Sequence, residues 1–432
     1  MGNLVNLHYL DIRDANSIKR MPLGIDKLTN LQRLSEFVIR EGDGQHIRDL
    51  KYLSNLKGDF NIFGLENVNG EDAAEAKLNE KQRIDRLLEQ LVIQNYGGAK
   101  FSTWIADSSL KNMLSLKLRN CKNYKSLPSI GRLLLLKDLS ISGLDQVHKI
   151  GAELFGENQS NAFASLESLC FDNMLNWEEW DLCEDDEQVS KFPSLSKLSI
   201  KSCPLLWGRL PTILQSLQKL EISECRRLVV SILGFPLLSE ISVEGCQKLV
   251  DEGSLSVQKV TSLKHVSLSN ISKFNISAER IMLRFANSEK FDIYDWEELG
   301  SLSQIGLRLV GHRFIEIVKC PQLISLEKEK ERLQLDNIPG VESLLIVNCE
   351  NFGVLPKCIN NFTSLRELKV SYCSADTSFL EEGFPTNLTT LAISNVPKIF
   401  TSLVEWGFNR LTSLQQLDIS SEGCSNVVSF PE

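Results

Sequence analysis

The side chains that could do chemistry in this chain are few, and their spacing builds no catalytic site. The 432 residues contain five histidines without an H-x-x-x-H pair, and no G-x-S-x-G nucleophile turn. The phosphate-binding patterns G-x-x-x-x-G-K-[ST] and G-x-G-x-x-G are also absent. The sequence therefore predicts a protein that is not an enzyme, with no cofactor in this chain.

The eleven cysteines predict buried thiols rather than disulfides or a metal site. No two of them are closer than nine residues, so the ligand spacings of structural zinc sites are missing. Seven stand three residues after the second apolar residue of a recurring L-x-x-L-x-I motif, where stacked motifs would form a column of small, reduced side chains. These seven are Cys121, Cys203, Cys225, Cys246, Cys320, Cys349 and Cys373.

The remaining candidate site is a surface. Residues that flank the two apolar strand positions point to the opposite face of the strand, where a partner can meet them. Earlier repeats carry mainly basic residues there and middle repeats mainly acidic ones, which would orient a protein of complementary charge. The other interpretation is a solvated polar sheet face without a partner. The candidate partner-binding residues are Lys117, Arg119, Lys197, Lys201, Lys219, Glu221, Glu224, Glu240, Glu244, Lys290, Asp292, Tyr294, Glu367, Lys369 and Tyr372.

A repeated short strand must position these residues. The stretch from Leu217 to Leu228, LQKLEISECRRL, gives the rule L-x-x-L-x-(I/L/V)-x-x-C-x-x-L. One such strand cannot bury its apolar face alone and needs copies on both sides. The paired positions recur seventeen times at spacings of 21 to 31 residues, as in leucine-rich repeats. The pairs are Leu10/Ile12, Leu34 with a degenerate Glu36, Phe60/Ile62, Leu91/Ile93, Leu116/Leu118, Leu139/Ile141, Leu169/Phe171, Leu198/Ile200, Leu220/Ile222, Ile241/Val243, Val266/Leu268, Phe291/Ile293, Ile315/Ile317, Leu344/Ile346, Leu368/Val370, Leu391/Ile393 and Leu417/Ile419.

The repeats predict an α/β solenoid, a leucine-rich-repeat arc with parallel strands on its concave face and loops and short helical turns on its convex face. We expect a single domain over residues 1–432. Its parts are N-terminal repeats without a cap (1–70), regular repeats (91–275), degenerate repeats (276–335) and further regular repeats without a clear cap (336–432). The missing caps predict an excerpt of a longer protein.

Three segments interrupt the pattern. Residues 71–90, EDAAEAKLNEKQRIDRLLEQ, predict an inserted helix. Residues 177–187, WEEWDLCEDDE, hold seven carboxylates and predict a solvated acidic loop, with a docking surface for a basic partner as the alternative. Within 276–335, His312 stands where a Leu is expected, as a surface or filler residue.

Charge and hydropathy restrict the partners. A net charge of −9, from 47 basic and 56 acidic residues, gives no general attraction to phosphate backbones, so nucleic acid is not an expected partner. No apolar run approaches the ~20 residues of a membrane span, and residues 1–30 lack the features of a signal peptide. These observations predict a cytoplasmic or nuclear protein without a membrane span.

Ordered motifs over nearly the whole chain resemble one known family. They include GNLVNLHYLDI, MPLGIDKLTNLQRLSEFVI, LSNLKGDFNIFGLENV, DAAEAKLNEKQRIDRLLEQL, NYGGAKFSTWI, LRNCKNYKSLPSIGRLLLLKDLSI and WEEW. This order is similar to the leucine-rich-repeat region of plant intracellular disease-resistance proteins of the coiled-coil nucleotide-binding (NLR) type, the RPP13-like proteins. The family usually has a further strand and variable loop where Leu87 to Tyr96 lie here, so about one repeat is missing.

The resemblance implies a function in plant defense. Repeats of such receptors recognise pathogen effectors, directly or through a guarded host protein, and hold the receptor autoinhibited against its own nucleotide-binding domain. ATP or ADP would bind only in that domain, outside this chain. A truncated, non-signalling receptor copy is an alternative.

Two further interpretations use the same surface. A freestanding module, such as the substrate-recognition arm of a ubiquitin ligase, would need an adaptor-binding helical segment that the sequence lacks. An extracellular ectodomain gains support from sequons such as those at Asn270, Asn275, Asn361 and Asn387. The cysteine column, the missing signal peptide and the irregular repeat length argue against secretion.

Overall fold

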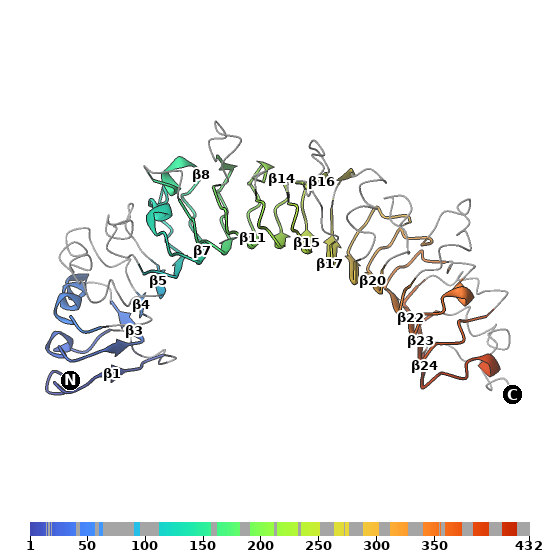
Figure 1. The fold of residues 1–432 in the computed structure, drawn as a ribbon, viewed down its shortest axis with the longest axis horizontal. Coiled ribbons are helices and arrows are strands. Elements are labelled where there is room, and N and C mark those ends of the chain that lie inside the picture. The colour runs from blue at the N-terminus through green and yellow to red at the C-terminus, as the bar shows by residue number, and fades with distance from the viewer. Residues whose placement is uncertain are drawn as a thin grey trace. The chain divides into compact units, whose positions relative to one another are not determined.

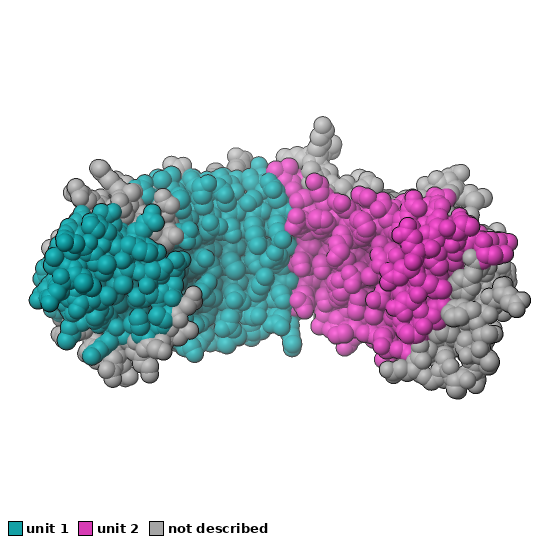
Figure 2. All heavy atoms as spheres, turned by 90° about the horizontal axis from the view of Figure 1, so that it is seen from below, with its two compact units in different colours: residues 1–229 teal, residues 230–432 magenta. Residues whose placement is uncertain are grey.

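The chain is a succession of short parallel strands in a computed structural model. The described residues fall into two compact units, residues 1–229 and 230–432 (Figure 2). Within each unit the main strands lie side by side on one face, and the chain returns on the other (Figure 1). The structure describes residues 1–13, 15, 18, 20–39, 44–56, 60–63, 90–95, 112–156, 162–181, 191–210, 214–231, 235–250, 263–271, 273–275, 288–301, 312–326, 340–353, 355, 359–373, 383–396 and 408–420.

The first unit holds one main parallel sheet. Its strands follow the chain order and lie in register, so that Leu198 of one strand pairs with Leu220 of the next. The strands are β3 (Glu36–Val38), β4 (Phe60–Phe63), β5 (Gln90–Gln94), β6 (Ser115–Arg119), β7 (Asp138–Ser142), β9 (Ser168–Asp172), β11 (Lys197–Lys201) and β13 (Lys219–Ser223).

The second unit repeats this arrangement. Its strands are again parallel and in register, as Phe291 with Ile315 and Leu344 with Leu368 show. They are β15 (Glu240–Glu244), β17 (His265–Ser269), β19 (Lys290–Tyr294), β20 (Phe314–Val318), β21 (Ser343–Val347), β22 (Glu367–Ser371), β23 (Thr390–Ser394) and β24 (Gln416–Ser420).

Shorter elements complete the chain, and the helices among the described residues are all of the 3-10 type. The short strands are β1 (Tyr9–Leu10) with β2 (Arg33–Leu34), β8 (Lys149–Ile150) with β10 (Glu179–Trp180), β12 (Gly208–Arg209) with β14 (Leu228–Ser231), and β16 (Lys248–Val250) with β18 (Lys273–Asn275). The helices are η1 (Ile25–Lys27), η2 (Gly44–Tyr52), η6 (Ile130–Arg132), η7 (Ala152–Leu154), η10 (Ile359–Asn361) and η12 (Phe408–Arg410).

The repeat rule explains the core. The motif positions Leu217, Leu220, Ile222, Cys225 and Leu228 are all at most 1% exposed, because each stacks on the equivalent residues of its neighbours. Burial of a Leu or Ile side chain stabilises the fold by roughly 1.5–3 kcal/mol. The predicted column of seven cysteines is confirmed, since all seven are buried free thiols.

A left-handed residue ends most of the five-residue strands. The residue after β21, Asn348, has a φ of 55°, and its N–H donates to the Ser371 carbonyl of the next rung at 2.9 Å. Asn, Asp and Gly tolerate this conformation best, which accounts for their frequency there. Lys319 and Tyr372 adopt it without that advantage, at φ values of 56° and 52°.

One predicted strand pair is wrong. Leu34 pairs with Leu10 as expected, but Phe37 and not Glu36 is the next buried residue, and Phe37 pairs with Ile62. An extra residue between Leu34 and Phe37 shifts the alternation, as a β-bulge does. The other predicted pairs that fall in strands of the main sheets are confirmed in register, including those within 276–335.

The predicted insertions are only partly described. The helix predicted at 71–90 lies outside the described residues except for Gln90, which is the first residue of β5 and not helical. In the predicted acidic loop 177–187, residues 182–187 also lie outside. The first part is not a solvated loop, because Trp177 is fully buried and Glu179 and Trp180 form β10.

Candidate functional site

The open sheet face of each unit is the surface formed by the first, third and fifth residues of the five-residue strands from β5 to β23 of the main sheets. The second and fourth residues are buried, so alternation leaves the other three facing away from the core. Most of the predicted partner-binding residues lie on this face. Glu224 and Tyr372 occupy instead the left-handed position just after β13 and β22.

Three lysines converge on one carboxylate in the first unit. The Nζ atoms of Lys197, Lys201 and Lys219 lie 3.6, 3.2 and 3.3 Å from the Glu221 carboxylate oxygens. The Ser199 hydroxyl donates to the same carboxylate at 3.2 Å. The cluster carries an excess of positive charge, but its two signs are interleaved and not separated along the face.

The lysines control the ionisation of Glu221. Burial alone would raise the pKa of this carboxyl, but the hydrogen bond and charge of Lys201, followed by Lys219, lower the pKa to about 2. Glu221 therefore stays ionised at neutral pH. It holds the lysine side chains in a fixed arrangement on β11 and β13.

Two other predicted groups of the first unit lie apart from this cluster. Lys117 and Arg119 are on β6, with β7 and β9 between them and the lysines of β11. Glu224 follows β13 and accepts a hydrogen bond from the Ser202 hydroxyl at 2.9 Å. The structure thus brings together four of the predicted residues of this unit.

Opposite charges also pair on the open sheet face of the second unit. Glu240 lies 3.7 Å from the His265 ring, and Lys290 lies 2.7 Å from Asp292. Glu244 ends β15, four residues from Glu240, the other carboxylate of its strand. The Lys290 ammonium therefore compensates part of the predicted acidic character.

Asp292 is more buried than its predicted role requires. Only 8% of the residue is exposed, and its Oδ1 atom has no hydrogen-bond partner among the described residues. Burial raises the pKa of its carboxyl, although the Lys290 ammonium works in the opposite direction. The pKa of the adjacent Tyr294 phenol is also raised, first by burial and then by the charge of Asp292 and its hydrogen bond to Glu316.

The last predicted group lies on β22. Glu367 accepts a hydrogen bond from the Ser343 hydroxyl of β21 at 2.8 Å, and Lys369 occupies the third position of β22. Tyr372 is 54% exposed. A partner contact by any of these residues stays a prediction.

Sequence reasoning missed an apolar patch on the same face. The apolar patch consists of Phe314 and Val318 on β20 and Leu345 and Val347 on β21, at open-face positions. Phe314 is 36% exposed, and the other three are half-buried. The signal was the sequence SLLIV of β21, in which apolar residues continue through positions that are polar in most repeats.

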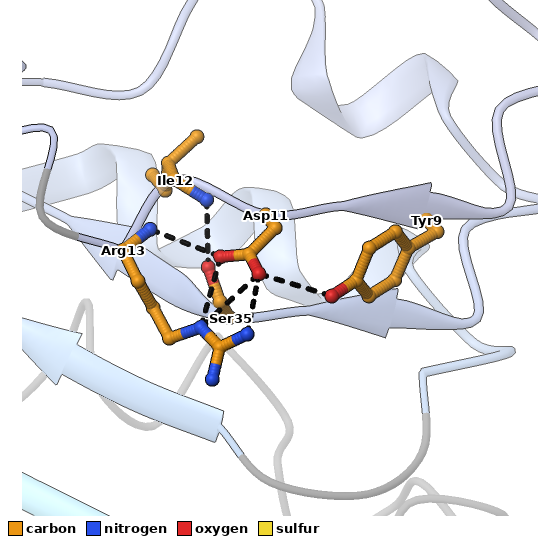
Figure 3. Close-up of polar contacts among 5 residues, drawn as sticks. All are labelled: Tyr9, Asp11, Ile12, Arg13 and Ser35. Atoms are coloured by element: carbon orange, nitrogen blue, oxygen red, sulfur yellow. Dashed lines mark hydrogen bonds and ion pairs between the residues drawn. The ribbon is translucent and has the colours of Figure 1, made fainter.

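A polar cluster on the first repeat was also missed. Figure 3 shows Tyr9, Arg13 and Ser35 turned toward Asp11. The Tyr9 hydroxyl donates to Asp11 at 3.0 Å, and the Arg13 guanidinium binds the same carboxylate at 2.6 Å. The Arg13 guanidinium, through its hydrogen bonds, holds the pKa of the Asp11 carboxyl well below its usual range. The alternation of Tyr9 and Asp11 with Leu10 and Ile12 was the available signal.

His312 is confirmed as a filler of the core. It is 3% exposed at the leucine position of its repeat, and its Nδ1 lies 2.5 Å from the hydroxyl of buried Ser288. Ser288 occupies the same position one repeat earlier. Two consecutive leucine positions are thus replaced by a hydrogen-bonded pair, which the Phe291 ring covers at 5.0 Å from the imidazole.

Within the described residues, no group of three or more His, Cys, Asp or Glu side chains could hold a metal ion. No helix in the same residues is long and apolar enough to cross a bilayer. The open sheet face carries charged side chains that pair with groups on the same and on neighbouring strands.

Comparison with known proteins shows which proteins contain similar repeats. Residues 86–144 match the family described as R13L1/DRL21 leucine-rich repeats. The chain is 31% identical to the putative disease resistance RPP13-like protein 1 of Arabidopsis thaliana over 78% of its own length and 31% of that protein. It is 28% identical to the putative disease resistance protein At3g14460 of the same plant, over 93% of the chain and 36% of that protein.

Two further comparisons give lower similarity. A putative disease resistance protein of Solanum bulbocastanum, RGA4, is 28% identical over 48% of the chain and 24% of its own length. A leucine-rich-repeat protein of Leptospira interrogans aligns with 96% of the chain and 96% of its own, at 17% identity and a TM-score of 0.43. The chain spans about a third of the length of the two Arabidopsis relatives.

Proposed function

Because the chain is a leucine-rich-repeat relative of the RPP13-like plant disease resistance proteins, we propose that it is the sensing region of an immune receptor. Its open sheet face would recognise a pathogen effector, directly or through a guarded host protein. In the absence of that signal it would contact the receptor's own nucleotide-binding domain and hold the receptor inactive. Binding of ATP or ADP would belong to that domain, and the receptor would act in the cytoplasm.

The observation that carries this proposal is the similarity to disease resistance proteins along most of the chain. The open sheet face supports it, because the charged residues are held in fixed positions and lose little conformational entropy on binding. Charged residues at an interface contribute more to specificity than to affinity.

Co-precipitation with the nucleotide-binding segment of the parent receptor tests the autoinhibitory contact. We expect the chain to retain that segment at low salt, and the change of Lys201 and Lys219 to Glu to weaken retention by roughly tenfold. The matched control reverses Arg226 and Arg227, which are exposed on the return side. Failure to retain the segment, together with failure to bind any effector or host protein, would refute the proposed function.

A further inference from the structure

We propose that the apolar patch and the carboxylates of Asp292 and Glu316 beside it form the docking site for a basic, apolar protein segment. In this segment a Lys or Arg would stand next to a large apolar or aromatic side chain. The inference rests on the proposed function, because it names the chemistry of the partner that the open sheet face would bind.

The apolar half of the site follows from the strand register. Glu316 on β20 pairs with Leu345 on β21, and Val318 pairs with Val347, so the apolar side chains lie beside one another. Four of the six open-face positions of these two strands are apolar. By contrast, all six open-face positions of β15 and β17 are polar, as are all six of β11 and β13.

A sheet face that contacts only water gains no stability from apolar side chains at these open-face positions. Exposed Phe, Leu and Val side chains that gather in one place are a mark of interaction sites, and aromatic residues are enriched where partners bind most tightly. The Arg313 guanidinium lies 5.5 Å from the Phe314 ring centroid and keeps the edge of the patch polar. The patch is therefore an apolar centre with a charged rim.

The charged half of the site is acidic. Around the patch, the carboxylates of Glu289, Asp292, Glu316, Glu342 and Glu367 face three cations, Lys290, Arg313 and Lys369, of which Lys369 pairs with Leu345 in the register. Arg313 is held between Glu289 and Glu342 at 3.7 and 2.8 Å, and Lys290 is bound to Asp292. Glu316 occupies the centre of β20, next to Leu345 of β21. The excess charge at the rim is negative and suits a cationic partner.

Asp292 is the residue of the rim at which the negative charge is least compensated. Its Oδ1 atom is buried without a hydrogen-bond partner among the described residues, although Lys290 binds the other side of the carboxylate. Burial leaves the charged form of this group under-compensated, as the raised pKa of its carboxyl shows. A guanidinium or ammonium group of the partner, placed over Glu316, would stabilise the carboxylates of Glu316 and Asp292. The apolar side chain next to it in the partner segment would cover Phe314 and Leu345.

Selection from a displayed library of random linear peptides on the full chain tests the proposal. We expect the enriched peptides to place Arg or Lys within a residue or two of Trp, Phe or Leu. Fluorescence anisotropy with one such labelled peptide should show roughly tenfold weaker binding for Leu345→Ser and, independently, for Glu316→Lys. The matched control Asp418→Lys reverses a charge at the third position of β24, the position that Glu316 has on β20, with β22 and β23 between it and the patch, and should leave the affinity within about twofold.

Four results would overturn the proposal. They are enrichment of acidic peptides, binding that neither substitution weakens, no enrichment at all, and a dimer in sedimentation velocity that Leu345→Ser converts to monomer. The last result would assign the patch to a second copy of the chain. None of these results bears on retention of the nucleotide-binding segment through Lys201 and Lys219, so the two proposals can fail separately. Circular dichroism of each variant confirms that it is folded.

Discussion

Charged residues of the open sheet face are arranged by their neighbours, and Glu221 shows this most clearly. Three ammonium groups and one hydroxyl surround its carboxylate. Removing the carboxylate would leave Lys197, Lys201 and Lys219 close together without an anion. Glu221 is thus a positioning residue for the basic side chains that we expect to contact a partner.

Glu221→Gln should lower the stability of the first unit in a pH-dependent way. The folded pKa of about 2 lies below the ordinary value of 4.5, so the stabilisation is complete above pH 4.5 and is lost as the pH falls through 2. Solvent screening reduces it to roughly 1 kcal/mol at neutral pH. Urea unfolding at pH 7 and pH 3 should show a difference between wild type and variant that narrows at the lower pH. An equal difference at both values would contradict this.

The hydrogen bond between Ser288 and His312 should make the contributions of these two residues to the stability depend on each other. Ser288→Ala leaves a buried imidazole nitrogen without its 2.5 Å partner and should cost about 1–3 kcal/mol. Combining it with His312→Leu restores the apolar residue of the repeat and should recover more than half of that cost. Chemical denaturation of the two single variants and the double variant gives the coupling energy, and strict additivity would show that the pair is not coupled.

At the scale of the element, most of the described repeats consist of a strand that ends at one left-handed residue. The N–H group of this residue bonds to the next rung, so the position is fixed by the backbone whatever its side chain. Asn and Asp serve well there, whereas Lys319 and Tyr372 bear a conformational cost.

Lys319→Gly should therefore stabilise the second unit by about 0.5–1 kcal/mol, because glycine relieves the strain of the positive φ. Asn348→Gly, at the same position one repeat later, is the control and should change the stability by less than about 0.5 kcal/mol. Differential scanning calorimetry of both variants measures the effect. If Lys319→Gly is less stable than the wild type, the Lys side chain contributes more stability than the left-handed conformation of its backbone costs.

Much of the strand register follows from the sequence. The pairs from Leu116/Leu118 to Leu417/Ile419 could be predicted because burial of one face leaves a single register, and a slip of one residue would expose every Leu. Glu36 could not be placed correctly, since nothing in the local pattern signals the extra residue that brings Phe37 into the core. The helix predicted at 71–90 stays a prediction, because of these residues only Gln90 is described.

The candidate site was less predictable than the fold. Alternation identifies which face a residue occupies, so Lys197 and Glu221 could be assigned to one surface from the sequence. It does not show that Asp292 is largely buried, nor that Lys201 and Lys219 share one carboxylate, because both depend on side-chain positions in neighbouring repeats. The apolar patch was missed because only charged residues and tyrosines were considered.

At the scale of the molecule, the cysteine column belongs to the cores of both units. Cys225 donates its thiol to the Ser223 carbonyl at 3.3 Å, and Cys373 makes the same contact with Ser371. Burial raises the pKa of the Cys373 thiol to about 12. Hydrogen bonds with the Cys203 and Cys320 thiols lower the pKa of the Cys225 and Cys349 thiols, so burial, and not a raised pKa, is what should keep these two from reacting.

All seven column thiols should resist iodoacetamide at pH 8 in the folded protein and react after unfolding in urea. The reason is that the thiolate is the nucleophile and these thiols are buried. Mass spectrometry of tryptic peptides assigns the modification to each cysteine. Rapid labelling of Cys225 or Cys349 in the folded state would contradict the prediction.

The alternation within each strand has a consequence for how such a chain can change over generations. Residues that specify folding and residues that can meet a partner occupy different positions of the same short strand, as in Lys219–Ser223. Substitutions of the exposed residues among the first, third and fifth positions can then accumulate with small effects on stability, since they leave the buried second and fourth positions untouched. Under the proposed function, single changes on the open sheet face would alter the binding specificity without compensating mutations in the core.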